Sequence, residues 1–146
     1  MSDTYLRIIP DDSNFIPSTE REATTVELLI ALLPGAEVVA KRSEEVQFID
    51  PGENFERVLC PSCRADLTNS WPSLVDDAWT KKFSDLSFET PCCHTPANLN
   101  RLVYEWPTGF ARFVVEVNVG RFLPEVQVES VAESLGCRVR QVLSRY

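Results

Sequence analysis

The segment "FARFVVEVNV", residues 110–119, decides the class of fold, because it carries the clearest strand pattern in the chain. Its side chains alternate between two faces: Ala111, Phe113, Val115, Val117 and Val119 fall on one, and Arg112, Glu116 and Asn118 on the other. Successive side chains of a strand point to opposite faces of a sheet. The segment therefore predicts a strand with one face in the core and the other toward solvent.

Around this strand the sequence contains further strand and helix patterns. Strands are expected at residues 5–10, 36–41, 45–50, 56–60, 86–90 and 101–106, and helices at residues 18–33, 72–83, 126–136 and 138–146. Thr19 and Glu22 have capping-box spacing at the start of the first helix, and Gly136 is typical of a helix C-cap. We expect a single domain over residues 1–146 of the α+β class. It would have a mainly antiparallel sheet, three or four helices and a cysteine-bearing insert.

Two cysteine motifs lie in that insert. Cys60 and Cys63 in "LCPSCRADL" (residues 59–67) are two residues apart, and "TPCCHTP" (residues 90–96) places two cysteines beside the only histidine. A Cys-x2-Cys turn after a strand can point both thiolates at one ion, and a second such turn completes a tetrahedral site. The segments around 58–66 and 88–98 therefore predict the two halves of a zinc ribbon.

The motifs offer five candidate ligands for four positions. The favoured set is Cys60, Cys63, Cys92 and Cys93. Adjacent cysteines can both bind one ion only in an irregular turn, and the prolines that flank Cys92 and Cys93 favour such a turn. If the turn is regular, His94 would replace one of these two cysteines as a ligand. Cys137 follows a helix C-cap far along the chain and is expected to be a buried small apolar residue.

Other uses of the cysteines are less well supported. Disulfides are rare in a cytoplasmic chain, and five cysteines leave one unpaired. A redox Cys-x2-Cys motif normally opens the helix of a βαβ unit, and no such unit is expected here. Free buried thiols are the remaining alternative to a metal site. A site with four protein ligands has no open position for water, so we expect a structural Zn²⁺ that fixes the fold.

The chain offers little for catalysis. His94 is its only histidine and lies among the candidate ligands, which leaves no imidazole for a nucleophilic dyad or triad. There is no phosphate-binding glycine loop. Acid pairs such as Asp11-Asp12 and Asp76-Asp77 are adjacent in sequence, which is typical of solvated surface. We therefore expect that the protein is not an enzyme.

Charge and hydropathy limit the partners and the compartment. The chain has 14 basic and 22 acidic residues, a formal net charge of −8. An acidic surface repels nucleic-acid phosphates and suits basic protein partners. No apolar run approaches the roughly 20 residues of a membrane span, and "MSDTYLRIIPDD" (residues 1–12) lacks the pattern of a secretion signal. A cytoplasmic protein without a membrane segment is expected.

Six segments span nearly the whole chain in a fixed order: "YLRIIP", "EVQFID", "NFERVLCPSC", "ETPCCHTPANLN", "YEWPTGFARFVVEV" and "LGCRVRQVLSRY". Together they resemble a family of small bacterial proteins that are mostly described as hypothetical or zinc-ribbon-like. The resemblance implies that the four favoured cysteines bind metal and that "WPTGFARF" is a family feature of unknown purpose. It implies no activity. Members of the family carry glycine after each cysteine pair, where this chain has Arg64 and His94.

Two functions fit these observations. The first is a non-enzymatic protein-binding module with a structural zinc site, such as an immunity-type protein that neutralises a basic toxin or enzyme. Trp106 and Phe110 could anchor that partner, with core packing as the alternative for both. The second is a zinc-ribbon protein that binds nucleic acid or regulates transcription, with two helices in residues 126–146 and phosphate contacts from Arg138, Arg140 and Arg145. The net charge makes the first function the expected one.

Overall fold

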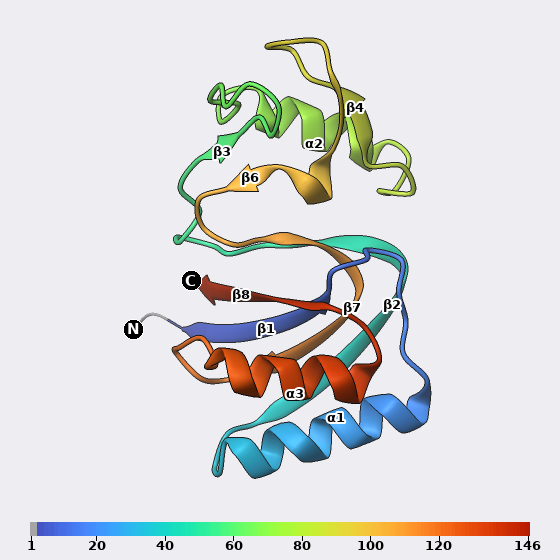
Figure 1. The fold of residues 1–146 in the computed structure, drawn as a ribbon, viewed down its shortest axis with the longest axis vertical. Coiled ribbons are helices and arrows are strands. Elements are labelled where there is room, and N and C mark those ends of the chain that lie inside the picture. The colour runs from blue at the N-terminus through green and yellow to red at the C-terminus, as the bar shows by residue number, and fades with distance from the viewer. Residues whose placement is uncertain (1–2) are drawn as a thin grey trace.

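A computed structural model describes residues 3–146 (Figure 1), so Met1 and Ser2 of the stretch inspected for a signal lie outside the described residues. In chain order the elements are β1 (Thr4–Pro10), α1 (Thr19–Leu32), β2 (Val38–Ile49), β3 (Val58–Leu59), α2 (Trp71–Trp79), β4 (Ser87–Glu89), β5 (Pro96–Asn98), the 3-10 turn η1 (Leu99–Arg101), β6 (Val103–Tyr104), β7 (Gly109–Val117), α3 (Glu125–Leu135) and β8 (Val139–Arg145). The predicted α+β class is confirmed. Within residues 3–146 no helix has the length and apolar character needed to cross a membrane.

Four strands form one antiparallel sheet in the order β2-β7-β1-β8. Helices α1 and α3 cover one face of this sheet, and residues 50–108 form an insert on its other side (Figure 1). The insert lies between β2 and β7 in the chain, and within it β3 pairs with β6 and β4 with β5. Both cysteine motifs belong to the insert, for which the sheet is the platform.

The molecule has two main clusters of buried side chains. The main core lies between the sheet and its helices and contains Leu6, Ile8, Leu29, Leu33, Phe113, Val115, Val117, Leu123, Val131, Leu135 and Leu143. The second core fills the insert and contains Val46, Val58, Cys60, Leu67, Phe83, Leu86, Leu99, Leu102 and Phe110. Because Val46 and Phe110 belong to β2 and β7, apolar burial packs the insert onto the sheet.

Strand β7 follows the predicted alternation over residues 113–117, where every second side chain is buried in the main core. Ala111 is the exception. It packs with Ile9 and Val142 in a separate small cluster, not with the main core. The pairing of β7 with β2 shifts register at this point, where β2 passes through residues 42–47. The extra residues at this irregularity belong to β2, so β2 bends at the place where the packing of β7 changes.

The helix expected over residues 138–146 is wrong, because this segment forms strand β8 and pairs with β1 along its length. The spacing of Val139, Val142 and Leu143 fits a helix. The middle of β8 is buried on both faces, however, and Val142 and Leu143 belong to different clusters. Burial on both faces removes the two-residue alternation by which a strand is recognised. Residues 126–146 therefore contain no helix-turn-helix.

The ends of α1 and α3 and the length of β2 can be compared with the expected elements. Ser18, not Thr19, caps α1, and its hydroxyl accepts the N–H of Arg21. Gly136 ends α3 with a φ of 82°, the left-handed cap that glycine adopts without strain. The two strands expected at residues 36–41 and 45–50 are one strand, β2, with the irregularity described above between its halves.

Candidate metal centre

The first cysteine-bearing turn, here called the first knuckle (residues 60–65), follows β3. The N–H of Cys60 donates to the carbonyl oxygen of Ala65 (2.9 Å), and the N–H of Arg64 donates to that of Cys60 (3.0 Å). Arg64 has a φ of 66°, which lets the chain turn back tightly. The N–H of Ser62 points at Sγ of Cys60 (3.4 Å). The turn thus encloses the sulfur of its first residue.

The second knuckle (residues 90–95) joins β4 to β5 and repeats this pattern. The N–H of Thr90 donates to the carbonyl oxygen of Thr95 (3.0 Å), and the N–H of His94 donates to that of Thr90 (2.9 Å). His94 has a φ of 54°, also in the left-handed region. The sequences "CPSCRA" and "TPCCHT" are therefore equivalent residue by residue, and Thr90 corresponds to Cys60.

The knuckles bring together four sulfur atoms, those of Cys60, Cys63, Cys92 and Cys93, all within 4.8 Å of one another. The distance from Sγ of Cys63 to that of Cys92 is 3.4 Å, and the distance from Cys60 to Cys93 is 3.8 Å. Four sulfurs arranged tetrahedrally at about 2.3 Å from zinc are about 3.8 Å apart. The cluster has the dimensions of a tetrahedral thiolate site, with two sulfurs from each knuckle.

The second knuckle supplies its sulfurs in an unusual way. Because Thr90 takes the position of Cys60, this knuckle has no sulfur at its first residue. Cys92, at the position of Ser62, supplies one instead, and its Sγ is 3.9 Å from that of Cys93. The irregular turn that two adjacent cysteines require is therefore present.

Two threonines that the sequence patterns did not single out contact the sulfur of Cys93 through their hydroxyl groups. The hydroxyl oxygens of Thr90 and Thr95 each lie 3.2 Å from its Sγ. Thr90 is fully buried, and its hydroxyl also accepts the N–H of Thr95 at 2.9 Å. Hydrogen bonds of this kind orient a ligand and tune its charge. The signal that could have found Thr90 is the match of "TP" to "CP" when the two knuckles are aligned.

The remaining candidate ligand, His94, and the fifth cysteine, Cys137, lie apart from the sulfur cluster. The Nδ1 atom of His94 is 3.2 Å from a carboxylate oxygen of Glu89, and its side chain is 77% exposed. Cys137, which was expected to be buried, is half-buried and packs against the edge of the main core. Within residues 3–146 the four cysteines form the one group of His, Cys, Asp and Glu side chains close enough to share an ion.

The surroundings of the sulfurs shift their pKa values in opposite directions. The N–H groups of Cys63 and Ser62 lower the pKa of the Cys60 thiol to about 6. The hydroxyls of Thr90 and Thr95 lower the pKa of Cys93. Loss of hydration and the neighbouring sulfurs raise the pKa of Cys92 to about 12. A metal ion bound here would have to displace the proton of Cys92 before all four sulfurs could bind as thiolates.

The aromatic residues expected to anchor a partner are placed differently. Phe110 is fully buried in the second core, with its ring centre 5.2 Å from that of Phe83, which contradicts its expected role as a surface anchor. Trp106 is half-buried, its Nε1–H donates to the carbonyl oxygen of Leu143 (3.0 Å), and its ring lies 5.7 Å from that of Phe122. Core packing explains Phe110, because β7 begins beneath the insert.

Comparisons of this chain with models of protein families, with curated proteins and with solved structures find no match. The resemblance to small bacterial zinc-ribbon-like proteins therefore stays a prediction.

Proposed function

We propose that this chain is a non-enzymatic protein-binding module whose insert is folded around one structural zinc ion. The observation that carries the zinc is the approach of four sulfur atoms to within 4.8 Å of one another. Zinc favours four thiolates in a tetrahedron, at sulfur separations close to those present. Two facing knuckles with two sulfurs each form the arrangement of a zinc ribbon, with Cys60, Cys63, Cys92 and Cys93 as ligands.

The insert has a physical need for such an ion. Its strands β3, β4, β5 and β6 are only two or three residues long, and α2 has no fully buried side chain. Elements this short supply few hydrogen bonds, whereas structural zinc binding contributes about 10–16 kcal/mol in zinc-finger peptides. Four protein ligands also leave no position for a reactive water, which supports a structural and not a catalytic role.

Metal analysis tests the zinc directly. Protein purified without added zinc should carry one equivalent per chain, and Co²⁺ exchanged into the site should show the absorption of a tetrahedral four-sulfur centre. Protein that is folded, contains only traces of metal and has freely titratable thiols would contradict the proposal.

Helix α3 carries an acidic stripe, defined here as Glu125, Glu129 and Glu133, that favours a basic partner. The three residues are four positions apart on one helix face, and all are exposed. Within the part of the chain that the structure describes, none of them is in an ion pair. Like charges at this spacing destabilise a helix by about 0.2–0.5 kcal/mol per pair. A basic surface would relieve that repulsion, which fits an immunity-type protein that neutralises a basic toxin or enzyme.

Charge-matched variants test the stripe. The triple variant E125Q/E129Q/E133Q removes three charges from α3, and E37Q/E44Q/E45Q removes three exposed charges beside and within β2. With an oligolysine peptide as the probe, only the first variant should weaken binding, and the association rate of the wild type should fall as salt rises. An equal loss in both variants would show that net charge alone attracts the probe.

The nucleic-acid alternative loses one of its arguments, the helix-turn-helix expected in residues 126–146. Strand β8 (Val139–Arg145) takes the place of the second helix, and the half-buried guanidinium of Arg140 is paired with Asp11 at 2.8 Å. Arg145 lies 3.8 Å from a carboxylate oxygen of Glu53. A titration with duplex DNA at low salt separates the two functions, because tight binding with a steep salt dependence would favour the alternative.

A further inference from the structure

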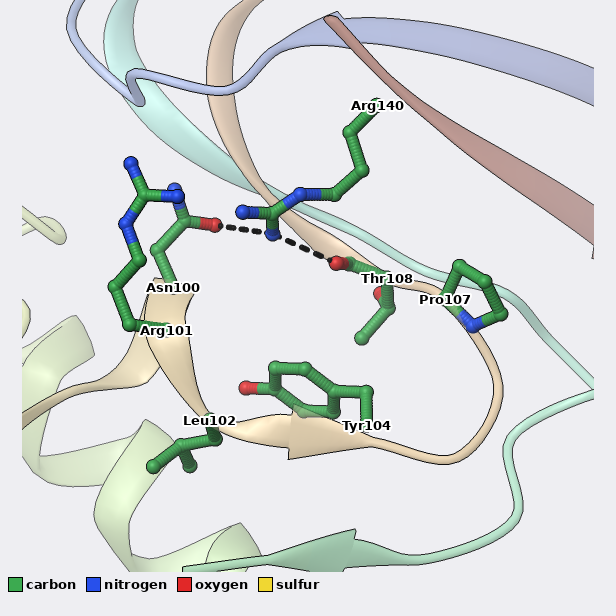
Figure 2. A pocket seen from close by; sticks show the side chains of 7 residues that line it. All are labelled: Asn100, Arg101, Leu102, Tyr104, Pro107, Thr108 and Arg140. Carbon is green, nitrogen blue, oxygen red and sulfur yellow. Dashed lines mark hydrogen bonds between the residues drawn. The ribbon is translucent and has the colours of Figure 1, made fainter. Parts of the chain in front are cut away.

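A cavity of about 340 Å³ opens where the insert meets the sheet (Figure 2). It is lined by Asn100, Arg101, Leu102, Tyr104, Pro107, Thr108 and Arg140. These residues come from η1 and the residue that follows it, from β6, from the loop before β7, and from β8. Cavities of about 300–1,000 Å³ at the junction of two packed parts are the usual sites for small ligands. None of the four clustered cysteines lines this one.

The charged side chains that line the cavity, Arg101 and Arg140, are cationic, although the chain as a whole carries −8. Arg140 reaches in from β8, and its Nη1 donates to Oδ1 of Asn100 (3.1 Å) and to the carbonyl oxygen of Thr108 (3.0 Å), as Figure 2 shows. The buried Oδ1 of Asn100 also accepts the N–H of Phe110 (2.9 Å), which fixes the amide. The guanidinium is therefore held in position before any ligand arrives.

One carboxylate is shared by the two arginines. Oδ1 of Asp11 lies 2.8 Å from Nη2 of Arg140, and its Oδ2 lies 2.8 Å from Nη1 of Arg101. Two guanidinium groups and one carboxylate leave a net charge of +1 at the cavity. Within the described residues, the Nε–H groups of both arginines make no hydrogen bond. A ligand with one negative charge would complete the balance.

The opposite side of the cavity is apolar. The ring of Tyr104 lies across the cavity from Arg140, and Leu102 and Pro107 also line it (Figure 2). The hydroxyl of Tyr104 is already used, since it donates to the carbonyl oxygen of Leu99 (2.6 Å) and accepts from Nε1 of Trp71 (3.1 Å). The phenol is thereby anchored in the insert and offers its ring carbons to the cavity. Flat apolar groups stack on such a surface.

We infer that this pocket binds a small monoanion that carries a planar apolar group, such as an aromatic carboxylate. The carboxylate would lie at Arg101 and Arg140, because a guanidinium pairs with a carboxylate through parallel hydrogen bonds. The planar group would lie against Tyr104. This inference goes beyond the proposed function and does not depend on the metal.

Three probes with the full-length, zinc-loaded protein test the inference. Benzoate has both features, benzamide lacks the charge, and acetate lacks the ring. In a ¹H–¹⁵N NMR titration we expect benzoate to shift amides of residues 99–109 and 139–141, with a dissociation constant of about 1 mM. Benzamide and acetate should bind about tenfold more weakly. Absence of shifts at about ten times that benzoate concentration overturns the inference, as does equal binding of benzamide or acetate.

A pair of arginine variants locates the anion. R101Q should weaken benzoate binding by about tenfold, because a hydrogen-bonded charge is lost at the pocket. R121Q is the matched control, since Arg121 is also exposed but does not line this cavity, and its affinity for benzoate should equal that of the wild type. Y104F keeps the ring and should retain binding. Equal affinities of R101Q and R121Q for benzoate would overturn the assignment.

Discussion

Thr90 occupies in the second knuckle the position that Cys60 occupies in the first. Each residue opens its turn by donating its N–H to the carbonyl of the residue five positions on, and each is fully buried. The side chains differ in what they offer. Cys60 contributes a sulfur to the cluster, whereas the hydroxyl of Thr90 lies 3.2 Å from the sulfur of Cys93. The second knuckle therefore holds a supporting hydroxyl where the first holds a candidate ligand.

Replacing Thr90 by valine should weaken metal binding. T90V keeps the shape of the side chain but removes the hydrogen bond to Cys93 and leaves the N–H of Thr95 without its acceptor. Loss of such a supporting contact typically lowers metal affinity about 10–100-fold. Competition with a chromophoric zinc chelator measures the effect. T90S retains the hydroxyl and should bind nearly as the wild type does, so equal losses in T90V and T90S would point to packing and not to the hydrogen bond.

Replacing Cys60 by serine should unfold the insert while the sheet remains folded. The insert has its own core, which includes Cys60, and the main core lies on the far side of the sheet. We expect a loss of more than about 3 kcal/mol in the free energy of unfolding of the insert. Hydrogen exchange should become fast in residues 55–106 and stay slow in β1 and β7.

C137S provides the comparison for this experiment. Cys137 packs against the main core and is not part of the sulfur cluster. Its replacement should leave the zinc content at one equivalent and the exchange of the insert unchanged. Zinc release from C137S, or a C60S protein with a protected insert, would contradict the assignment of the ligands.

The sequence predicted correctly those helices and strands that have one face in the core and the other toward solvent. Residues 113–117 of β7 and helix α3 follow their patterns because each buries one side only, whereas residues 109–111 of β7 are buried in succession beneath the insert. Strand β8 does not, because Val142 and Leu143 are buried on opposite faces of the sheet, and their spacing imitates a helix. Pairing with β1 decides the conformation there, and a long-range pairing leaves no local signal.

The sulfur cluster and the cavity differ in the same way, because only the cluster has a local sequence signal. Cysteine spacing pointed to the sulfur cluster, since each knuckle is a local turn with its own sequence pattern. The cavity had no such signal, because Arg101 and Arg140 come from separate elements and are joined only through Asp11. In the sequence, Asp11 belongs to an adjacent acid pair and Arg140 to a group of arginines near the end of the chain, and neither pattern points to the other.

Glycine at the left-handed positions of the knuckles should stabilise the protein. Arg64 and His94 have φ values of 66° and 54°, which cost a residue with a Cβ atom about 1–2 kcal/mol. Glycine avoids that strain but loses more chain entropy on folding, so R64G and H94G should each raise the free energy of unfolding by about 0.5–1 kcal/mol. Urea unfolding of the zinc-bound protein measures this change in the free energy of unfolding. A65G, at a neighbouring position outside the left-handed region, should be destabilising, and the opposite ranking would show that the turns are not strained.

Asp11 should make the stability of the fold depend on pH in the acid range. Burial opposes its ionisation, but hydrogen bonds from Arg101 and Arg140 outweigh this and hold the pKa of the carboxyl below its ordinary value. A carboxyl with a lowered pKa in the folded state stabilises the protein fully above its unfolded pKa of about 4. That contribution is lost as the pH falls from about 4 through the folded value.

The comparison of D11N with the wild type isolates this effect. At neutral pH the variant should be less stable by about 0.5–1 kcal/mol, because the carboxylate is partly solvated and its ion pairs are screened. The two proteins should converge below pH 4, since protonation then removes the charge from the wild type as well. Any acid-induced loss of zinc affects both proteins alike and cancels in the difference. Urea unfolding between about pH 2.5 and pH 7 gives the two curves. If the difference in the free energy of unfolding stays constant over the whole pH range, Asp11 acts through its shape alone. Its carboxylate would then not neutralise positive charge at the cavity as the ion pairs suggest.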